Sequence, residues 1–301
     1  MFKFVKKNRN IAYLLAHNKE SSYKLGKRLA SVCSRMNTKD IRISTFYINK
    51  MTKVRSKFKK KEGKYRTIRY LVNKDNRKIA KVIALILEST IPNKEYMHGF
   101  LTGKGIYTFR KQSKAEHYLK IDLSNAFEQI SANWVYTYFR KVCDLNKKDA
   151  EFLTKISTYN GKVYQGCPFS PILFNAYYAN AINTLNKLGH IRTIAYADDI
   201  LVMSDIRISW KMMRLIHKIL KSNGLKPNPK KCRFNSTDEV YYLGLNLKKN
   251  KIRQGQKTRK RIKHTTYNLF NLDHGENSEY LYQKAKGLKG WYQSGFNLGT
   301  V

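Results

Sequence analysis

The chain has 301 residues, enough for one large domain or for two to three subdomains that share a core. Its 60 lysines and arginines against 20 acidic residues give a formal net charge of +40, and 21 tyrosines and 14 phenylalanines are interleaved with them; this predicts a nucleic-acid partner and argues against a membrane surface. No Cys-x-x-Cys pair occurs and the apolar run from Ile79 to Leu87 is too short to span a bilayer, so we expect no zinc site, no disulfide, no export and a cytoplasmic protein.

The hydrophobic pattern predicts helices and hairpins in alternation. The first 50 residues have the apolar spacing of basic helices, and alternation over 53–72 around Glu62-Gly63 predicts a β-hairpin with a basic rim. The elements expected after it are a helix over 73–90, a strand over 118–123, helices over 134–141, 149–159 and 174–188, a hairpin over 191–203, a helix over 209–223, a strand over 240–247 and a helix over 251–288. Antiparallel hairpins mixed with helices favour an α+β fold over a doubly wound sheet.

Asp198 and Asp199 are adjacent carboxylates with apolar strand residues on both sides, so the predicted hairpin presents acid at its tip. Two charges this close raise one pKa unless a cation lies between them, and carboxylate oxygens favour Mg²⁺ over softer metals. Taken alone, Asp-Asp is more often an ordinary polar turn. The hypothesis of a metal site therefore requires a third carboxylate elsewhere in the chain.

Asp122 is the candidate for that third carboxylate, because it ends a predicted strand 76 positions before Asp198. If the two strands are neighbours, Asp122 and Asp198 can share two Mg²⁺ ions, which activate an attacking hydroxyl and stabilise a leaving pyrophosphate. The alternative is that Asp122 only caps its strand.

Five segments together carry a resemblance to reverse transcriptases, and specifically to bacterial retron-type enzymes. In chain order they are Asp122 with Phe127, Gln165 to Pro171, Tyr196-Ala197-Asp198-Asp199, Gly224 to Lys231, and Tyr242-Leu243-Gly244-Leu245. Each segment alone is weak or moderate, but their order and spacing over residues 55–250 are specific to the family. The resemblance implies a right-hand polymerase with fingers over 51–118 and part of 140–190, a palm over 119–250 with an antiparallel sheet, a short basic helical thumb over 251–301, and a basic helical extension over 1–50.

The resemblance also implies roles for individual residues. Asp122, Asp198 and Asp199 are the catalytic and metal-binding carboxylates, with Asp199 the weaker candidate for direct ligation. Phe127 stands at the steric gate that disfavours a 2′-hydroxyl, although a packing phenylalanine is the alternative. The residues implied in nucleotide binding are Arg66, Lys64 (with Lys60 or Lys61 as alternatives), Phe127, Gln165, Gly166 and Lys231 (with Lys230 as its alternative). Those implied at the primer and template are Tyr196, Gly103, Gly105, Tyr242, Leu243 and Gly244.

Two departures from retron enzymes leave the exact class open. The window from Tyr107 to His117 lacks the Asn-Ala-x-x-His motif of many retron enzymes, and Tyr242-Leu243-Gly244 replaces their Val-Thr-Gly. The resemblance implies a structured non-coding RNA as template, an RNA–DNA hybrid product, dNTP substrates, two Mg²⁺ ions replaceable by Mn²⁺, and an anti-phage role beside an effector protein. A group II intron-like or other defence-associated reverse transcriptase, and a non-catalytic RNA-binding scaffold, are the alternatives.

The segment from Lys226 to Lys263 is the most basic part of the second half. It contains thirteen lysines and arginines against Asp238 and Glu239. We expect these cations to contact the phosphates of an RNA or of the template–primer duplex, with a solvated basic surface as the alternative.

Overall fold

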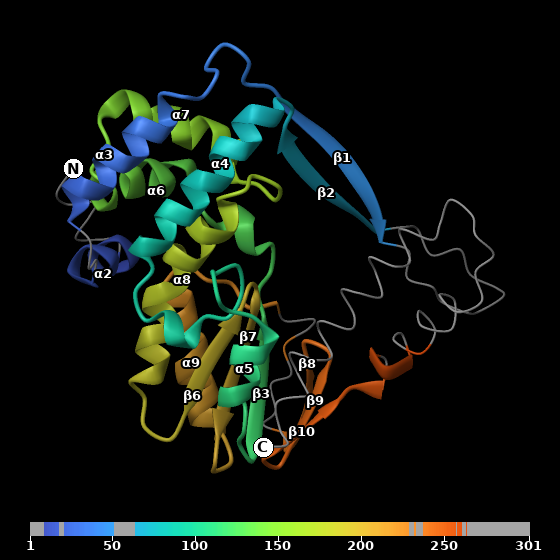
Figure 1. Ribbon diagram of the computed structural model, residues 1–301. Coiled ribbons are helices and arrows are strands. Elements are labelled where there is room, and N and C mark those ends of the chain that lie inside the picture. Colours follow the sequence, from blue (N-terminus) through green and yellow to red (C-terminus); the bar gives the residue numbers. More distant parts are fainter. Residues whose placement is uncertain are drawn as a thin grey trace, which may run out of the picture. The chain divides into compact units, whose positions relative to one another are not determined.

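The computed structural model describes residues 9–17, 21–50, 64–228, 232, 237–256, 258–260 and 263 (Figure 1). The chain divides into two compact units. The first comprises Met1–Asn93, Ser124–Ala181 and Ser222–Lys226, and the second comprises Lys94–Leu123, Ile182–Lys221 and Pro227–Val301. Within the described residues, no helix is long and apolar enough to cross a membrane.

The first unit is largely helical. Its helices are α2 (Arg9–His17), α3 (Ser22–Cys33), α4 (Lys74–Leu87), α6 (Ala132–Thr137), α7 (Lys147–Ser157) and most of α8 (Ser170–Asn186), with short helical turns at Glu88–Thr90, Ala126–Gln129 and Tyr138–Val142. Asn73 caps α4, because its side chain accepts hydrogen bonds from the backbone N–H groups of Asp75 and Asn76. The helix expected over 73–90 is therefore present, and its last turn tightens into the helical turn that ends at Thr90.

Two short hairpins complete the first unit. Strands β1 (Ile43–Lys50) and β2 (Lys64–Leu71) pair antiparallel from Ile43↔Leu71 to Lys50↔Lys64, and β4 (Thr158–Tyr159) pairs with β5 (Lys162–Val163). The sequence prediction was wrong about the partner of β2, since residues 43–50 had been expected to be helical. The Glu62-Gly63 turn lies outside the described residues.

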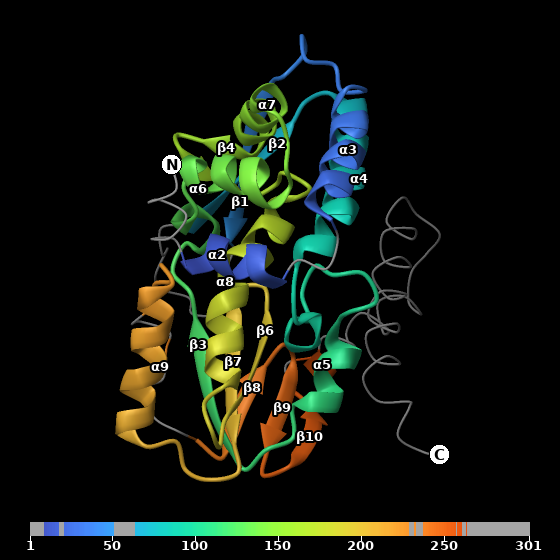
Figure 2. The ribbon, with the colours of Figure 1, turned by 90° about the vertical axis from the view of Figure 1, so that its left-hand side faces the viewer.

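The second unit is built on two antiparallel three-stranded sheets. One has the order β3 (His117–Asp122), β7 (Asp199–Ser204), β6 (Arg192–Tyr196), and the other has the order β10 (Lys251–Gln254), β9 (Leu245–Lys248), β8 (Glu239–Tyr242). Helices α5 (Ile106–Gln112) and α9 (Trp210–Ser222) and a helical turn at Lys94–Tyr96 belong to this unit. Helix α9 lies on the side of the β3–β7–β6 sheet away from β8–β10 (Figure 2).

The two sheets of the second unit share a hydrophobic core. Alternate residues of the first sheet, Tyr118, Ile194, Leu201 and Met203, pack with Val240, Tyr242, Leu245 and Leu247 of the second, and Phe109 of α5 joins them. The ring of Phe109 stacks on that of Tyr242 at a centroid distance of 4.9 Å. The residues between these on the strands, such as Ile121 and Val202, are buried too, so the first sheet is covered on both faces.

The α+β class with antiparallel sheets is confirmed, and two local expectations are corrected. Residues 240–247 form two strands joined at Leu243-Gly244, where the backbone φ angles are 49° and 84°, and such a two-residue turn needs positive φ. Lys251–Gln254 is the strand β10, because it pairs with β9, so the helix expected from residue 251 does not begin there. Residues 264–301, where the thumb was expected, lie outside the described residues.

Strand β6 has its outer edge covered by two contacts inside the second unit. The Asn186 side chain donates to the carbonyl of Thr193 at 2.8 Å and accepts from its N–H at 2.7 Å. The N–H of His98 donates to the carbonyl of Ala195 at 2.9 Å. These bonds satisfy backbone groups that an edge strand leaves unpaired.

His98 is fully buried in the second unit and its ring is held by two side chains. Its Nδ1 lies 2.8 Å from Thr108 Oγ1 and its Nε2 lies 3.2 Å from Gln112 Oε1. Burial lowers the pKa of His98 from 6.5 to about 4, the bond to Gln112 opposes this, and the charge of Lys104 adds to it. The folded protein therefore favours the neutral ring.

We predict that His98 makes the protein less stable as the pH falls from about 6.5 toward 4. The unfolded chain binds the proton first, so stability is complete above pH 6.5 and up to roughly 3 kcal/mol is lost across this window. Urea unfolding of wild type and His98→Gln at pH 7 and pH 5 should show a smaller loss in the variant. His190→Asn, at an exposed histidine, is the control and should behave as wild type; equal losses in all three proteins would contradict the prediction.

Candidate active site

The tip of the β6–β7 hairpin is a two-residue loop, Ala197-Asp198, closed by the pair Tyr196↔Asp199. Ala197 has a φ of 55°, which is costly for a residue with a Cβ atom, and the backbone of Gly99 lies directly against it. A Cβ atom on Gly99 would stand 2.6 Å from the Ala197 nitrogen. Only glycine fits at position 99, so the segment that covers β6 also supports the turn that carries Asp198.

Asp122 lies beside this tip, because β3 pairs with β7 in a register that ends at Asp122↔Asp199. The N–H of Leu123 donates to the carbonyl of Asp198 at 3.2 Å, which continues the contact to the loop residue. The three carboxylates expected from the sequence thus come from two neighbouring strand ends and the loop between strands. The adjacency of the two strands, on which the site hypothesis depended, is present.

Asp122 is further supported by the segment that follows α9. The N–H of Asn228 donates to the Asp122 carbonyl at 2.7 Å, its side chain lies 3.5 Å from Asp122 Oδ2, and the thiol of Cys232 lies 3.4 Å from the same carbonyl. The strand end is therefore held in place on its backbone, while the carboxylate stays half-buried.

Asp199 is paired with a cation that the sequence analysis missed. Lys120 Nζ lies 3.2 Å from Asp199 Oδ1, and the two side chains are 30% and 24% exposed. The buried Oδ1 atom accepts no directed hydrogen bond, so the contact is an ion pair. Lys120 stands two residues before Asp122 and so on the same face of β3, a position that strand alternation alone could have indicated.

The charge state of Asp199 reflects opposing influences. Burial raises the pKa of its carboxyl group, Lys120 lowers it through charge and contact, and the nearby Asp198 and Asp122 raise it again. Tyr242 completes the surroundings: its hydroxyl donates to the Asp199 carbonyl at 2.7 Å, and Lys120 Nζ lies 5.4 Å from its ring centroid. One lysine and one tyrosine therefore connect the β6–β7 hairpin to the β8–β9 hairpin.

The remaining primer and template candidates of the second unit lie on its sheets and turns. Tyr196 ends β6 and packs, partly buried, on the shared core. Tyr242 ends β8, and Leu243-Gly244 form the turn to β9. Gly103 and Gly105 lie in the turn before α5, where the N–H of Gly105 donates to Thr108 Oγ1 at 3.0 Å. Their contacts with nucleic acid stay predictions.

The nucleotide candidates other than Lys231 belong to the first unit. Phe127 is half-buried in the helical turn Ala126–Gln129, with its ring 5.5 Å from that of Phe174. The carbonyl of Gln165 accepts from the Arg69 N–H at 2.9 Å, and Gly166 has a φ of 119° with room for no Cβ atom, since one would stand 1.8 Å from the Arg69 carbonyl. The loop therefore lies directly on β2. Arg66 and Lys64 belong to β2, but their side chains are not among the described parts of the structure. The other lysine candidates lie wholly outside the described residues: Lys60, Lys61, Lys230 and Lys231.

The carboxylates fit a divalent cation in the chemistry of their donors, since they provide hard oxygen atoms from two adjoining strand ends and the loop between strands. In the described part of the chain, no three His, Cys, Asp or Glu side chains form a metal-binding cluster. With Asp199 paired to Lys120, Asp122 and Asp198 are the candidate ligands.

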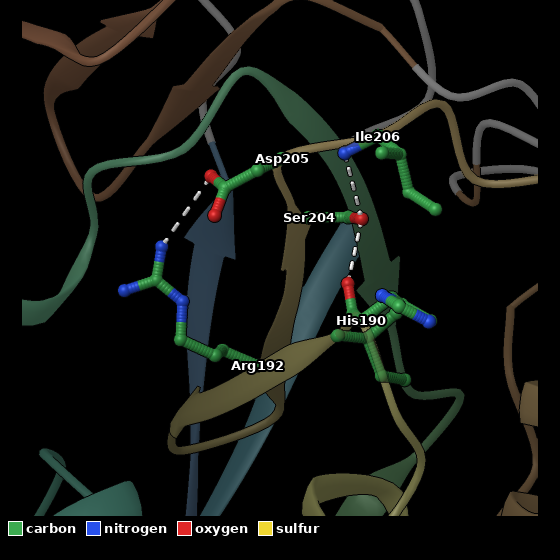
Figure 3. Close-up of a pocket in the computed structure, with 6 residues that line it drawn as sticks. His190, Arg192, Ser204, Asp205 and Ile206 are labelled. Carbon is green, nitrogen blue, oxygen red and sulfur yellow. Dashed lines mark hydrogen bonds and ion pairs between the residues drawn. The ribbon is translucent and has the colours of Figure 1, made fainter.

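A pocket of about 220 Å³ lies at the other end of the same hairpin (Figure 3). It is lined by His190, Ile191, Arg192, Ser204, Asp205 and Ile206. The Ser204 hydroxyl donates to the His190 carbonyl at 2.6 Å and Arg192 pairs with Asp205 at 3.8 Å. The six residues of β7 span about 17 Å, so this pocket is separate from the carboxylates.

Comparisons with known proteins support the resemblance. The model of the family described as "Reverse transcriptase (RNA-dependent DNA polymerase)" matches residues 58–247. The retron Se72 reverse transcriptase of Salmonella heidelberg (strain 579083-10) is 26% identical over 189 residues, which cover 57% of this chain and 48% of that protein. The chain thus spans about half the length of this curated relative.

Two solved structures illustrate more distant similarity. The foamy viral protease-reverse transcriptase in complex with an RNA/DNA hybrid has a TM-score of 0.40 and 23% identity, over 60% of this chain and 22% of that chain. Telomerase from Candida albicans in complex with a fragment of telomeric RNA has a TM-score of 0.49 and 12% identity. The match covers 91% of this chain and 58% of that chain. Both scores lie below 0.5, so the assignment of this chain to a family rests on the sequence matches.

The family match extends over more than half of the chain and includes every residue predicted for the site. Together with the retron relative, it confirms the resemblance to a bacterial retron-type reverse transcriptase. The chain belongs to the reverse transcriptase (RNA-dependent DNA polymerase) family.

Proposed function

We propose that the protein is an RNA-directed DNA polymerase that copies a structured non-coding RNA into DNA from dNTPs. The observation that supports this is the meeting of Asp122, Asp198 and Asp199 at adjoining strand ends within a chain of the reverse transcriptase family. Three acids at one end of a sheet are costly in a fold that does not use them. A non-catalytic RNA-binding scaffold has no need of this arrangement.

Asp122 and Asp198 are the proposed ligands of two Mg²⁺ ions, for which Mn²⁺ can substitute. Bound ions supply the Lewis acidity that favours the ionised primer hydroxyl and stabilises charge on the leaving pyrophosphate. Asp199 is paired with Lys120, and its proposed role is to contribute negative charge beside the two ligands without binding the metal itself. Tyr196 and the Tyr242-Leu243-Gly244 turn position the primer end, and Gly103 and Gly105 lie toward the template.

The incoming nucleotide is the proposed ligand of several residues of the first unit and of Lys231. Phe127 is placed to reject a 2′-hydroxyl, and the Gln165-Gly166 loop offers a backbone that a nucleotide can approach closely. Arg66, Lys64 and Lys231 are proposed to bind the phosphates through charge-assisted hydrogen bonds. The half-buried state of Phe127, which leaves part of its ring accessible, supports its assignment.

The retron relative supports a dedicated non-coding RNA as template and the RNA–DNA hybrid as product. An anti-phage role beside an effector protein is part of the same proposal. A group II intron-like or other defence-associated reverse transcriptase, with a different template or primer, is the alternative that the missing Asn-Ala-x-x-His motif keeps open.

Primer extension on an RNA template is the direct test, with Asp198→Asn as the variant. We expect extension to fall at least about 1,000-fold, because a neutral amide holds a divalent ion poorly at the position where charge develops. Asp205→Asn, an exposed acid at the other end of the hairpin, is the matched control and should retain activity. Unchanged dNTP incorporation by Asp198→Asn would refute the polymerase proposal.

Lys120→Met should lower kcat by about 10-fold, because it leaves the Asp199 carboxylate without its counter-charge beside the site. The KM for dNTP should change little, since Lys120 is proposed to act through Asp199 and not on the nucleotide. Lys120→Arg keeps the charge and should restore most of the activity. A wild-type kcat for Lys120→Met, or equal loss in both variants, would argue against this role.

Gly99→Ala should also reduce activity, because the added methyl group collides with the backbone of the Ala197-Asp198 turn. We expect a loss of about 10- to 100-fold in kcat from displacement of Asp198 by a few tenths of an ångström or more. Gly189→Ala, where an added Cβ meets no atom within 4 Å, is the control. Full activity of Gly99→Ala in the primer-extension assay would show that the turn does not depend on this contact.

A further inference from the structure

The exposed surface of helix α9 consists mainly of basic and apolar residues and includes no acidic side chain. From Ile206 to Ser222 the chain has five lysines and arginines and no acidic residue. All five are exposed, and within the described residues none of them forms an ion pair. We call them the α9 basic surface: Arg207, Lys211, Arg214, Lys218 and Lys221.

The helical members of this surface form a single stripe. At about 100° per residue, Lys211, Arg214, Lys218 and Lys221 fall within an arc of about 80° and extend over about 15 Å. Met213, Ile216 and Leu220 are buried on the opposite side of α9. The apolar face of the helix is therefore used inside the fold, and the outward face is a row of cations.

Helix α7 shows what an ordinary solvated face of this protein looks like. Its three lysines lie on both sides of Asp149 and Glu151 in the sequence, and Lys147 lies 4.0 Å from Glu151. Such mixed charges limit repulsion along a helix. The like charges at i, i+3 and i+4 on α9 repel each other, so the α9 basic surface lowers the stability of the free protein and favours a polyanion.

Large apolar side chains lie next to the cations. Trp210 is 52% exposed with Arg214 5.3 Å from its ring centroid, and Ile206, 58% exposed, lines the pocket of Figure 3. An exposed tryptophan beside a row of cations suits base or sugar stacking next to a bound phosphate chain. The pocket adds a concave end to the surface.

We propose that the α9 basic surface binds the backbone of the folded RNA template, outside the catalytic site. A lipid surface fits less well, because Trp210 and Leu215 lie about 140° apart on the helix and form no continuous apolar face. RNA is favoured over the DNA product because the template has to be held before any product exists. This proposal rests on the proposed function for the identity of the polyanion.

The test compares RNA binding by the full chain and by a triple variant, Lys211→Gln with Arg214→Gln and Lys218→Gln. The probe is a short RNA hairpin, and its affinity is measured by fluorescence anisotropy over a series of salt concentrations. We expect the affinity to fall roughly 10- to 100-fold. The slope of log affinity against log salt concentration should become smaller in magnitude by about 3, because each substituted cation neutralises about one phosphate in the wild-type complex. Trp210→Ala should weaken binding without changing the slope.

Lys147→Gln with Lys148→Gln and Lys155→Gln, on α7, removes the same charge and is the matched control. Its affinity should stay within about 3-fold of wild type. An α9 triple variant that binds the RNA hairpin no more weakly than this control would overturn the proposal. A loss seen only with anionic phospholipid vesicles, or only with a DNA hairpin of the same sequence, would also overturn it.

Catalysis separates this proposal from the proposed function. Extension of a short primer–template by the α9 triple variant should stay within about 3-fold of wild type, because the substituted cations are not part of the carboxylate site. An equal loss of extension and hairpin binding would show that α9 is no separate surface. Asp198→Asn should bind the RNA hairpin as wild type does. The RNA-binding proposal is therefore tested independently of the polymerase proposal.

Discussion

Strand β7 determines the geometry of the second unit, because it pairs over its length with β3 on one side and β6 on the other. Both ladders meet at Asp199, which has Asp122 and Tyr196 as its cross-strand neighbours. A shift of one residue in either ladder would turn the carboxylates to the other face of the sheet. The same register places Leu201 and Met203 in the shared core, so the packing of the core and the positions of the carboxylates depend on one pairing.

Burial and charge oppose each other at this strand end. Desolvation raises the pKa of Asp199, and Lys120 partly compensates for it from the neighbouring strand. The hydroxyl of Tyr242, on β8, donates a hydrogen bond to the backbone carbonyl of Asp199. The β8–β9 hairpin and the β6–β7 hairpin are thus linked by side chains as well as by the core, so a shift of one hairpin is felt by the other.

The net charge of +40 is a constraint on the whole protein. Some cations are neutralised by local acids, as on α7, and Lys120 is neutralised by Asp199 at the site. The α9 basic surface has no acidic partner among the described residues. The stability of the folded protein therefore depends on whether an anion is bound there. A bound polyanion relieves the repulsion among these cations.

The local pattern of the sequence was sufficient for the β6–β7 hairpin, for the strand that ends at Asp122 and for α4 from its Asn73 cap, because alternation, helical periodicity and capping act between near neighbours. It was also sufficient to single out Asp198 and Asp199, which are adjacent in the chain, whereas the position of Asp122 beside them depended on the pairing of β3 with β7. It misassigned Ile43–Lys50 and Lys251–Gln254, since a strand at the edge of a hairpin owes its state to a partner that no local window contains. Only the tertiary structure placed Lys120 on Asp199, Tyr242 on its carbonyl and Gly99 against Ala197, because these contacts depend on strand register and on backbone approach between segments far apart in the chain.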